Sequence, residues 1–466
     1  MSQEEGSSSA MSSPLQFFSM TPPSWGFGSQ CRVLKEMEPE ERGLYLIHLL
    51  LSCANHVSAG DVENANLALA QISQLASVEG DTMQRIASYF SEALAERILS
   101  QWPGIYMALN NTQISSSADE ILVQRLFFES FPFLKASIML TNQAIVEAME
   151  GEKMVHVIDL NAEWSEQWIP LIQAFSARPG GPPHLRITGV HRRREVLNHV
   201  ARNLTDEAER LDLPFQFNPV VIDSLETLDI DNLRVKTGEA LVISSVLQLH
   251  ALLAHDDEEV SRNKSPIASE ISSTHRQNML SELLRKDPVN RASLSPTESA
   301  ASSTLTCKNS GKMDGFLDAL WGLSPKLMVV MEQNANHDVP TVVQRLVDAL
   351  HYYATLFDCL ESTFPRTSVE RMKLEKMMFG EEIKNIIVWE GAKRKVRHQK
   401  LEKWVQRLEF AGFGNVPLSH YSTSYANLLM QGYKYGSYQI VEENGCAMMC
   451  WQNRPLFSVS AWRCRK

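Results

Sequence analysis

The stretch that decides the fold is Met154-Val155-His156-Val157-Ile158-Asp159-Leu160, an apolar run that leads into a helical pattern at Gln167–Arg178. A buried strand that ends in a carboxylate and gives way to a helix is how nucleotide-binding α/β folds begin. Those folds need a glycine-rich turn there, because backbone amides must approach the ligand closely. Here the turn is Asn161-Ala162-Glu163-Trp164-Ser165-Glu166, and the next glycine is Gly180. Side chains would fill the space where backbone amides hold the phosphate of a cofactor, and two carboxylates would repel that phosphate. The sequence therefore predicts the architecture of a cofactor-binding enzyme without the loop that binds the cofactor.

Strand and helix patterns alternate from residue 154 onward, with predicted strands near 154–160, 185–190, 215–221, 241–246 and 327–332. This succession predicts a largely parallel sheet with right-handed crossovers. Three further strands are predicted near the C-terminus, at Tyr438–Glu442, Ala447–Trp451 and Leu456–Trp462. The Asn444-Gly445 pair between the first two is a strong hairpin signal, and Asn453-Arg454-Pro455 is the predicted link between the last two.

The fold class that follows is α/β, with a mixed sheet that is parallel except for its antiparallel C-terminal strands. This is the Rossmann-like layout of adenosylmethionine-dependent methyltransferases. Residues 39–150 differ, because apolar residues recur there at helical spacing between the start signals Pro39, Gly60-Asp61 and Gly80-Asp81. We therefore expect a helical cap subdomain beside the α/β core. Its leucines should serve helix packing, and any surplus apolar stripe would be an interface.

Composition narrows the functional class. The chain has 466 residues, 44% of them hydrophobic, and a net charge of −11. This acidic charge disfavours direct DNA binding, which usually needs a broad basic surface. Seven scattered cysteines without a CxxC pair indicate reduced thiols and no metal site. No apolar run has the length of a membrane span, so neither a signal peptide nor a membrane segment is expected.

Two segments have the composition of disordered chain. Residues 1–34 and 256–312 are rich in serine and polar residues and show no sustained periodicity. Such composition buries too little apolar area to offset the entropy of ordering. We expect the first to be an N-terminal tail and the second a surface insertion in the α/β region.

His156 and Asp159 resemble a catalytic pair, yet their odd spacing on a strand predicts that they point to opposite faces of the sheet. A structural role is favoured for both, with Asp159 capping the following turn. Leu249, Leu252 and Leu253 fit the Leu-x-x-Leu-Leu pattern of helices that enter a partner's groove. Ordinary core packing is the alternative, because the motif directly follows a predicted buried strand.

Two basic clusters invite functional interpretation. Lys393, Arg394, Lys395 and Arg397 form a candidate nuclear signal or phosphate contact, with a solvated helix face as the alternative. The run 191–194, His-Arg-Arg-Arg, follows a predicted strand end, where α/β folds place ligands. An anion contact or a solvated helix start are the two interpretations there. No catalytic, cofactor-binding or metal-binding residue is predicted.

The sequence resembles the plant GRAS family of transcriptional regulators. Val155-His156-Val157-Ile158-Asp159 is similar to the family's Val-His-Ile-Ile-Asp signature, and the match continues through Gln167-Trp168 and the motifs at 178–183 and 185–189. The chain also ends in Ser460-Ala461-Trp462, the family's C-terminal motif. The sequence departs from the family at Glu166, where a glycine is usual. It departs again where Val396 and Gln399 replace the carboxylates of an Arg-x-Glu-Arg-His-Glu motif.

The resemblance implies a GRAS domain over 35–464. Its regions would be leucine-rich region I at 39–103, the Val-His-Ile-Ile-Asp region at 121–190, leucine-rich region II at 196–233, the Pro-Phe-Tyr-Arg-Glu region at 241–388 and the Ser-Ala-Trp region at 391–466. It further implies a non-enzymatic nuclear regulator in gibberellin signalling and plant development. The implied partners are DELLA or other GRAS proteins, in a homo- or heterodimer, and indeterminate-domain zinc-finger factors that provide indirect contact with DNA. The alternative is a methyltransferase-fold enzyme or small-molecule binder that uses adenosylmethionine.

Overall fold

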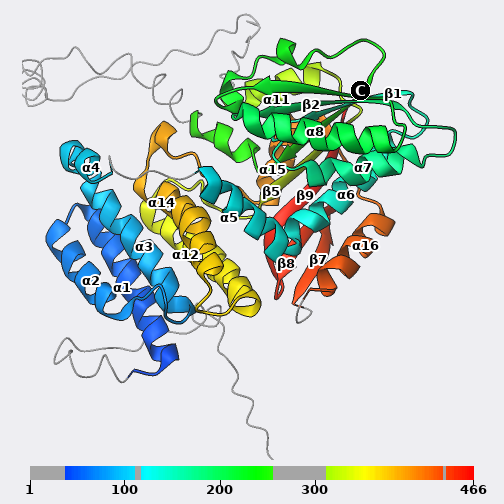
Figure 1. Cartoon of the computed structure of the whole chain (residues 1–466). Helices are drawn as coiled ribbons and strands as arrows, with labels where there is room; N and C mark the ends of the chain where they lie inside the picture. Colours follow the sequence, from blue (N-terminus) through cyan, green and yellow to red (C-terminus); the bar gives the residue numbers. More distant parts are fainter. Residues whose placement is uncertain (1–36, 111–116, 256–310, 434–436, 466) are drawn as a thin grey trace, which may run out of the picture.

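The computed structural model describes residues 37–110, 117–255, 311–433 and 437–465 (Figure 1). The predicted tail 1–34 lies outside the described residues, and so does the predicted insertion 256–312 except for its last two positions. Of those, Gly311 is the N-cap of a helix and Lys312 its first residue, so these two positions do not belong to the predicted insertion.

A mixed sheet forms the core, in the order β3-β2-β1-β4-β5-β9-β8-β7, with β6 also paired to β9. The parallel part is confirmed as predicted; its strands are β1 (Met154–Asp159), β2 (His184–His191), β3 (Phe215–Val221), β4 (Ala240–Val246) and β5 (Leu327–Gln333). Strand order reverses between β1 and β4, which is the place where open α/β sheets leave a crevice at their carboxyl ends.

The antiparallel C-terminal part is confirmed too. It consists of β6 (Phe413–Val416), which the sequence did not predict, β7 (Tyr438–Glu443), β8 (Cys446–Trp451) and β9 (Arg454–Cys464). Asn444 and Gly445 both have positive φ, of 51° and 77°, which closes the β7–β8 hairpin as the Asn-Gly pair predicts. The predicted link at 453–455 is wrong by two residues. Gln452 and Asn453 make the second turn with positive φ, so Arg454 and Pro455 already belong to β9.

Helices cover both faces of the sheet, because its inner strands carry apolar residues on both sides. Val155 and Val157 pack into one cluster with α6, α7 and α8, whereas Ile158 packs into a second cluster with α11 and α15. The bounds are α5 (Ser117–Ser130), α6 (Pro132–Ala148), α7 (Ser165–Ser176), α8 (Arg194–Arg210), α11 (Lys312–Gly322), α15 (Leu401–Phe410) and α16 (His420–Gln431). Shorter turns of helix are η3 (Leu225–Thr227), η4 (Ile230–Leu233), η5 (Leu249–His255), η6 (Glu375–Gly380) and η7 (Gly391–Lys393).

The predicted helical cap is present, but it is not built from 39–150 alone. Its N-terminal helices are α1 (Pro39–Ala59), α2 (Val62–Leu75), α3 (Thr82–Leu99) and α4 (Pro103–Asn110). Beside α1 and α3 lie α12 (Val342–Thr363) and α14 (Glu381–Val388), with α13 (Val369–Leu374) joining them (Figure 1). The polypeptide therefore returns to the cap after completing β5, and α6 belongs to the sheet layer instead.

A buried ion cluster ties the two parts of the cap together. Glu375 accepts from Arg85 of α3 at 2.8 Å and from Arg371 of α13 at 2.6 Å, and all three side chains are fully buried. Arg371 also reaches Glu361 at 2.8 Å, and Arg85 donates to the Arg366 carbonyl. Charges this deep are tolerated only when paired, so α3 and α13 are held in one relative position.

Candidate functional site

The strand that carries the Val-His-Ile-Ile-Asp signature places its two polar side chains on opposite faces of the sheet, as predicted. Asp159 accepts from Trp168 Nε1 at 2.7 Å and from the Asn161 N–H at 3.0 Å. The prediction that it caps the turn is therefore confirmed. Burial raises the pKa of Asp159 to about 6, against the lowering effect of these two donors.

His156 belongs to a separate polar group on the other face. Its Nε2 lies 2.8 Å from Thr188 Oγ1 and its Nδ1 lies 3.0 Å from the Arg186 guanidinium, which itself pairs with Glu239. Burial, and then the Arg186 charge, lowers the pKa of His156 to about 4, so the ring is neutral at physiological pH. His156 and Asp159 therefore do not form an acid–base pair.

The Gln-Trp pair after this strand fixes α7. Trp168 is buried against Asp159, and Gln167 donates to Ser244 Oγ of β4 at 3.0 Å while its carbonyl accepts from Asn142 of α6 at 2.6 Å. One short motif thus joins α6, α7 and two strands. Its role in this structure is positional.

The turn after β1 does not fit a nucleotide or adenosyl cofactor. Its first three amides already have acceptors. Asn161 N–H donates to Asp159, Ala162 N–H to the Val190 carbonyl at 3.0 Å, and Glu163 N–H to the Asn161 carbonyl at 2.7 Å. The strand below is equally crowded. A Cβ on Gly189 would lie 2.8 Å from Ala162 Cβ and 2.6 Å from the Phe217 ring. Gly189 therefore allows β2 to pack closely against the turn, and the backbone of residues 161–163 offers no free donor to a phosphate or ribose.

A crevice of about 260 Å³ remains at the carboxyl ends of β1, β2 and β4. Its polar wall is internally paired. Arg193 lies 3.3 Å from Glu120 and 3.9 Å from Glu163, and His191 lies 3.9 Å from Glu163. Residues 191–193 therefore meet carboxylates of α5 and of the β1 turn, which compete with any external anion, whereas Arg194 is exposed. Burial raises the pKa of Glu163, opposed by the two neighbouring arginines.

The Leu-x-x-Leu-Leu interpretation is wrong as a docking motif in this structure. Leu249, Leu252 and Leu253 lie on η5 and are buried in the cluster formed by β4, α11 and α15. Side chains in that position cannot enter a partner's groove without unfolding. Core packing, the alternative interpretation, is confirmed.

The basic cluster at 393–397 is likewise not a surface patch. Arg397 is buried and pairs with Asp338 at 2.9 Å, and the buried Arg394 donates to the His337 carbonyl at 2.8 Å. Burial lowers the pKa of Arg394 to about 10. No helix spans 394–400 either, so the alternative of a solvated helix face is also wrong; only Lys393 and Lys395 of the four are exposed.

Asp338 lies beside one of the two positions where the family's carboxylates are replaced, position 399. Its Oδ1 pairs with Arg397, and its Oδ2 accepts from Gln399 Nε2 at 2.8 Å. The acid that the motif lacks at 399 is thus supplied from the loop after β5. Sequence spacing could not indicate this, because the partners are about sixty positions apart.

The Ser-Ala-Trp motif lies inside the sheet. Ser460, Ala461 and Trp462 are buried in β9, opposite Val330, Val329 and Met328 of β5. Trp462 Nε1 donates to Ser460 Oγ at 2.9 Å, so the motif satisfies its own indole. Trp451, on the adjacent β8, donates to Asp358 of α12 at 2.7 Å, which confirms a packing role for both tryptophans.

The surplus apolar stripe expected of the cap lies on α4. This helix buries none of its residues; Ile105, Met107 and Leu109 are 52%, 58% and 57% exposed, and Trp102 precedes them at 43%. These four residues are called the cap surface below. Among the described residues, no helix is long and apolar enough to cross a membrane. Nor do the described ranges group three His, Cys, Asp or Glu side chains so that they could hold a metal ion.

Comparison with known proteins identifies the family. The model of the GRAS domain family matches residues 46–463. Scarecrow-like protein 3 of Arabidopsis thaliana is 56% identical, over 100% of this chain and 99% of its own length. DELLA protein GAI1 of Vitis vinifera is 31% identical, over 94% of this chain and 65% of its own length. The crystal structure of SCL7 from Oryza sativa superposes with a TM-score of 0.69 at 28% identity, covering 90% of this chain and 99% of that one. The chain therefore belongs to the GRAS family, whose members are plant transcriptional regulators.

Proposed function

We propose that this protein is a nuclear, non-enzymatic co-regulator of transcription that acts through protein contacts in gibberellin signalling and plant development. The observation that carries the proposal is the cap surface, a set of exposed apolar residues on and next to a helix that buries none of its residues. This helix contacts the rest of the fold through Tyr106, which packs against Trp389 and donates to Glu96. Soluble monomers rarely leave such patches uncovered without a binding role. The likeness to Scarecrow-like protein 3 and to a DELLA protein supports the signalling context.

The occupant of the cap surface is a second GRAS domain, either another copy of this chain or a DELLA protein. Trp102, Ile105 and Leu109 recur at helical spacing and present one continuous edge, which suits the apolar face of a partner helix. Trp102 lies in the region 39–103 that is assigned to leucine-rich region I, and the other three residues of the cap surface directly follow that region.

Size-exclusion chromatography with light scattering tests this assignment. Ile105→Glu with Leu109→Glu should abolish association, because charges would be buried unpaired at the centre of the interface. Leu428→Glu is the matched control, since Leu428 is equally exposed but lies on α16, outside the cap. Unchanged association of the α4 variant would refute the assignment.

DNA contact is indirect in this proposal, through an indeterminate-domain zinc-finger partner. The net charge is −11, and three arginines of the two basic clusters are engaged within the fold: Arg394 and Arg397 are buried, and Arg193 faces Glu120 and Glu163. Arg192 and Arg194 remain exposed. Direct binding would require a row of free cations along one face.

Gel-shift titration tests the recruitment. The purified chain should bind DNA weakly, with strong salt sensitivity and no sequence preference, and the zinc-finger partner should carry it onto that partner's site as a supershifted complex. Nanomolar, sequence-selective binding by the chain alone at physiological salt would contradict indirect recruitment.

The absence of adenosylmethionine chemistry is the second part of the proposal. The amides of Asn161, Ala162 and Glu163 are engaged, and Glu163 places a carboxylate where a cofactor would need donors. Titration calorimetry should therefore detect no adenosylmethionine binding at physiological concentration. Micromolar affinity would overturn this part and favour the enzyme alternative.

A further inference from the structure

Exposed apolar residues of α16 form a second surface, at the opposite end of the molecule from the cap surface on α4 (Figure 1). Tyr421, Tyr425 and Leu428 are 68%, 58% and 64% exposed, and their spacings of four and three place them on one face of the helix. The two tyrosine rings lie nearly parallel, at an angle of 7°, with their centroids 6.3 Å apart. These three residues are called the α16 surface below.

The opposite side of α16 is fixed to the fold. Asn427 accepts from the Ile440 N–H of β7 at 3.0 Å, which ties the helix to the edge of the sheet. Ser419, the N-cap of α16, donates to Glu147 near the end of α6 at 2.8 Å, and Tyr433 just after α16 accepts from Lys135 near the start of α6 at 2.7 Å. The two helices therefore run antiparallel, and the α16 surface is a rigid ridge that a partner can meet without reordering it.

The carboxylates beside the start of α16 are paired with neutral groups. Glu147 accepts from Gln143 and Ser419, both at 2.8 Å. Glu442 of β7 accepts from Thr423 and lies 3.9 Å from the exposed His420. Across the described residues, neither carboxylate forms an ion pair with a lysine or arginine. The helix itself contributes no lysine, arginine, aspartate or glutamate.

The lysine and the arginine bound to α6 are engaged away from these carboxylates. Lys135, near the start of α6, lies over the rings of Phe128 and Tyr433, 5.4 Å from each centroid. Arg178 donates to the Met149 and Glu152 carbonyls beyond the end of α6. The start of the α16 surface therefore keeps a negative charge that the fold does not pair.

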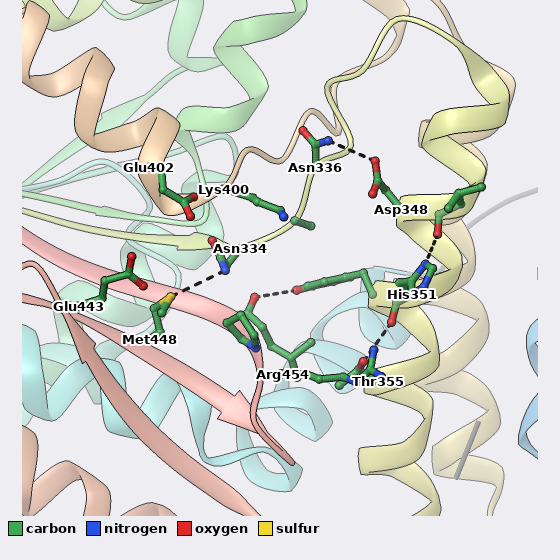
Figure 2. A pocket seen from close by; sticks show the side chains of 15 residues that line it. Asn334, Asn336, Asp348, His351, Thr355, Lys400, Glu402, Glu443, Met448 and Arg454 are labelled. Carbon is green, nitrogen blue, oxygen red and sulfur yellow. Dashed lines mark hydrogen bonds between the residues drawn. The ribbon is translucent and has the colours of Figure 1, made fainter. Parts of the chain in front are cut away.

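The other side of the β7–β8 strands has a different charge balance. Glu443, which alternates with Glu442 along β7, lines a cleft of about 500 Å³ together with Lys400, His351 and Arg454 (Figure 2). Carboxylates in that cleft lie among basic side chains. An acidic rim without basic neighbours is thus a property of the α16 side.

We propose that the α16 surface binds a basic amphipathic helix of a partner protein. Apolar residues of that helix pack along Tyr421, Tyr425 and Leu428, whose spacing spans two helical turns. A lysine or arginine at one end lies beside Glu147 and Glu442, and the tyrosine faces favour the same cations. Tyrosine is also among the residues that most often contribute binding energy at the centre of interfaces.

Charge decides between this occupant and a second copy of the chain. A second α16 carries no lysine or arginine, so helix-on-helix contact would bring Glu147 and Glu442 no cation from that helix. The inference does not depend on the cap surface. The Ile105→Glu, Leu109→Glu variant should therefore bind the same partner helix as the wild type does.

The test is selection from a displayed library of amphipathic helices, with leucines fixed on one face and Lys, Arg, Glu or Gln placed at random beside them. The library is selected on the full-length protein and counter-selected on the Tyr421→Ser, Tyr425→Ser variant. The helices that distinguish the two proteins should carry net positive charge. Synthetic copies should bind the wild type with a Kd below about 100 μM.

Titration of one synthetic helix then separates the apolar contribution from the charge. Tyr421→Ser with Tyr425→Ser should weaken binding at least about tenfold, because two aromatic anchors are lost. Glu147→Gln with Glu442→Gln should weaken it about threefold and flatten its dependence on salt, and this variant serves if the first folds poorly. Phe410→Ser, at an aromatic residue 70% exposed on α15, is the matched control and should bind like the wild type.

Three results would overturn the proposal. One is a library that yields no helix able to distinguish the wild type from the tyrosine variant. Another is selection of neutral or acidic helices, or a salt dependence that the glutamate variant leaves unchanged. The third is self-association of the chain, seen by light scattering and lost in the tyrosine variant, which would identify a second copy as the occupant.

Discussion

Acidification from pH 7.5 to 5.5 should destabilise the protein through two buried histidines. His337 Nδ1 lies 2.9 Å from His398 Nδ1, so one ring donates and the other accepts while both are neutral. A further proton would set two donors against each other. Burial, then the neighbouring His250 and Arg394 charges, lowers the pKa of His337 to about 3, and burial with His250 and His337 lowers that of His398 well below its usual value.

The magnitude follows from proton linkage. In the unfolded chain both rings have a pKa of about 6.5, so below that pH the unfolded state binds more protons and stability falls as pH falls. At pH 5.5 the loss is about 1.4 kcal/mol per ring, or about 3 kcal/mol for the pair. The other titratable and charged groups near the two histidines do not reverse the sign of this pH dependence. His250 is held by Glu332 at 2.9 Å, and Arg394 is shared with Asp338.

Asp159 acts in the opposite direction. Its folded pKa of about 6 lies above its unfolded value, so it takes up a proton on acidification and contributes somewhat less than 1 kcal/mol of added stability at pH 5.5. A comparison of two proteins cancels this contribution and that of the remaining histidines. The informative measurement is therefore the difference between the wild type and a variant without the pair.

Urea unfolding at both pH values provides the assay, with wild type and the His337→Gln, His398→Gln double variant. The variant starts from lower stability, but it should lose about 3 kcal/mol less between pH 7.5 and 5.5. Equal losses in the two proteins, within about 1 kcal/mol, would show that the pair accepts protons freely and would refute this reasoning.

Three other changes have expected outcomes. Glu375→Gln removes the buried charge between Arg85 and Arg371 and should lower the free energy of unfolding in urea by about 3–5 kcal/mol. Glu370→Gln, at an exposed position nearby, is the control and should lower it by less than about 0.5 kcal/mol. A small effect at position 375 would mean that water reaches the cluster. Trp168→Phe leaves the Asp159 carboxylate with one donor fewer and should cost about 1.5–3 kcal/mol, with a further rise in the Asp159 pKa measurable by carbon NMR. Leu252→Ala should lower the free energy of unfolding by about 2–5 kcal/mol, whereas the amount of partner recovered in a pull-down at low temperature should not change. A fully stable variant that no longer binds the partner would support the Leu-x-x-Leu-Leu motif as a binding motif.

The sequence by itself determined the strands and the turns, because their signals are local. Short, nearly continuous apolar runs such as 154–160 and 327–332 are typical of strands buried between helical layers, and Asn444-Gly445 has a backbone preference that needs no tertiary partner. The opposite orientation of His156 and Asp159 follows from the same local geometry. The missing glycine after β1 likewise predicted a turn whose amides are not offered to a ligand.

Only the tertiary structure decided how deep each polar residue lies and what it meets. The basic cluster in the sequence suggested that Arg394 and Arg397 lie on the surface. In the structure both are buried, and Asp338 and backbone carbonyls pair with them. The return of α12 and α14 to the cap depends on contacts between distant segments. Sequence patterns report periodicity along the chain, whereas burial and pairing depend on which segments fold against each other. The charged residues of this protein were for that reason the least predictable part of it.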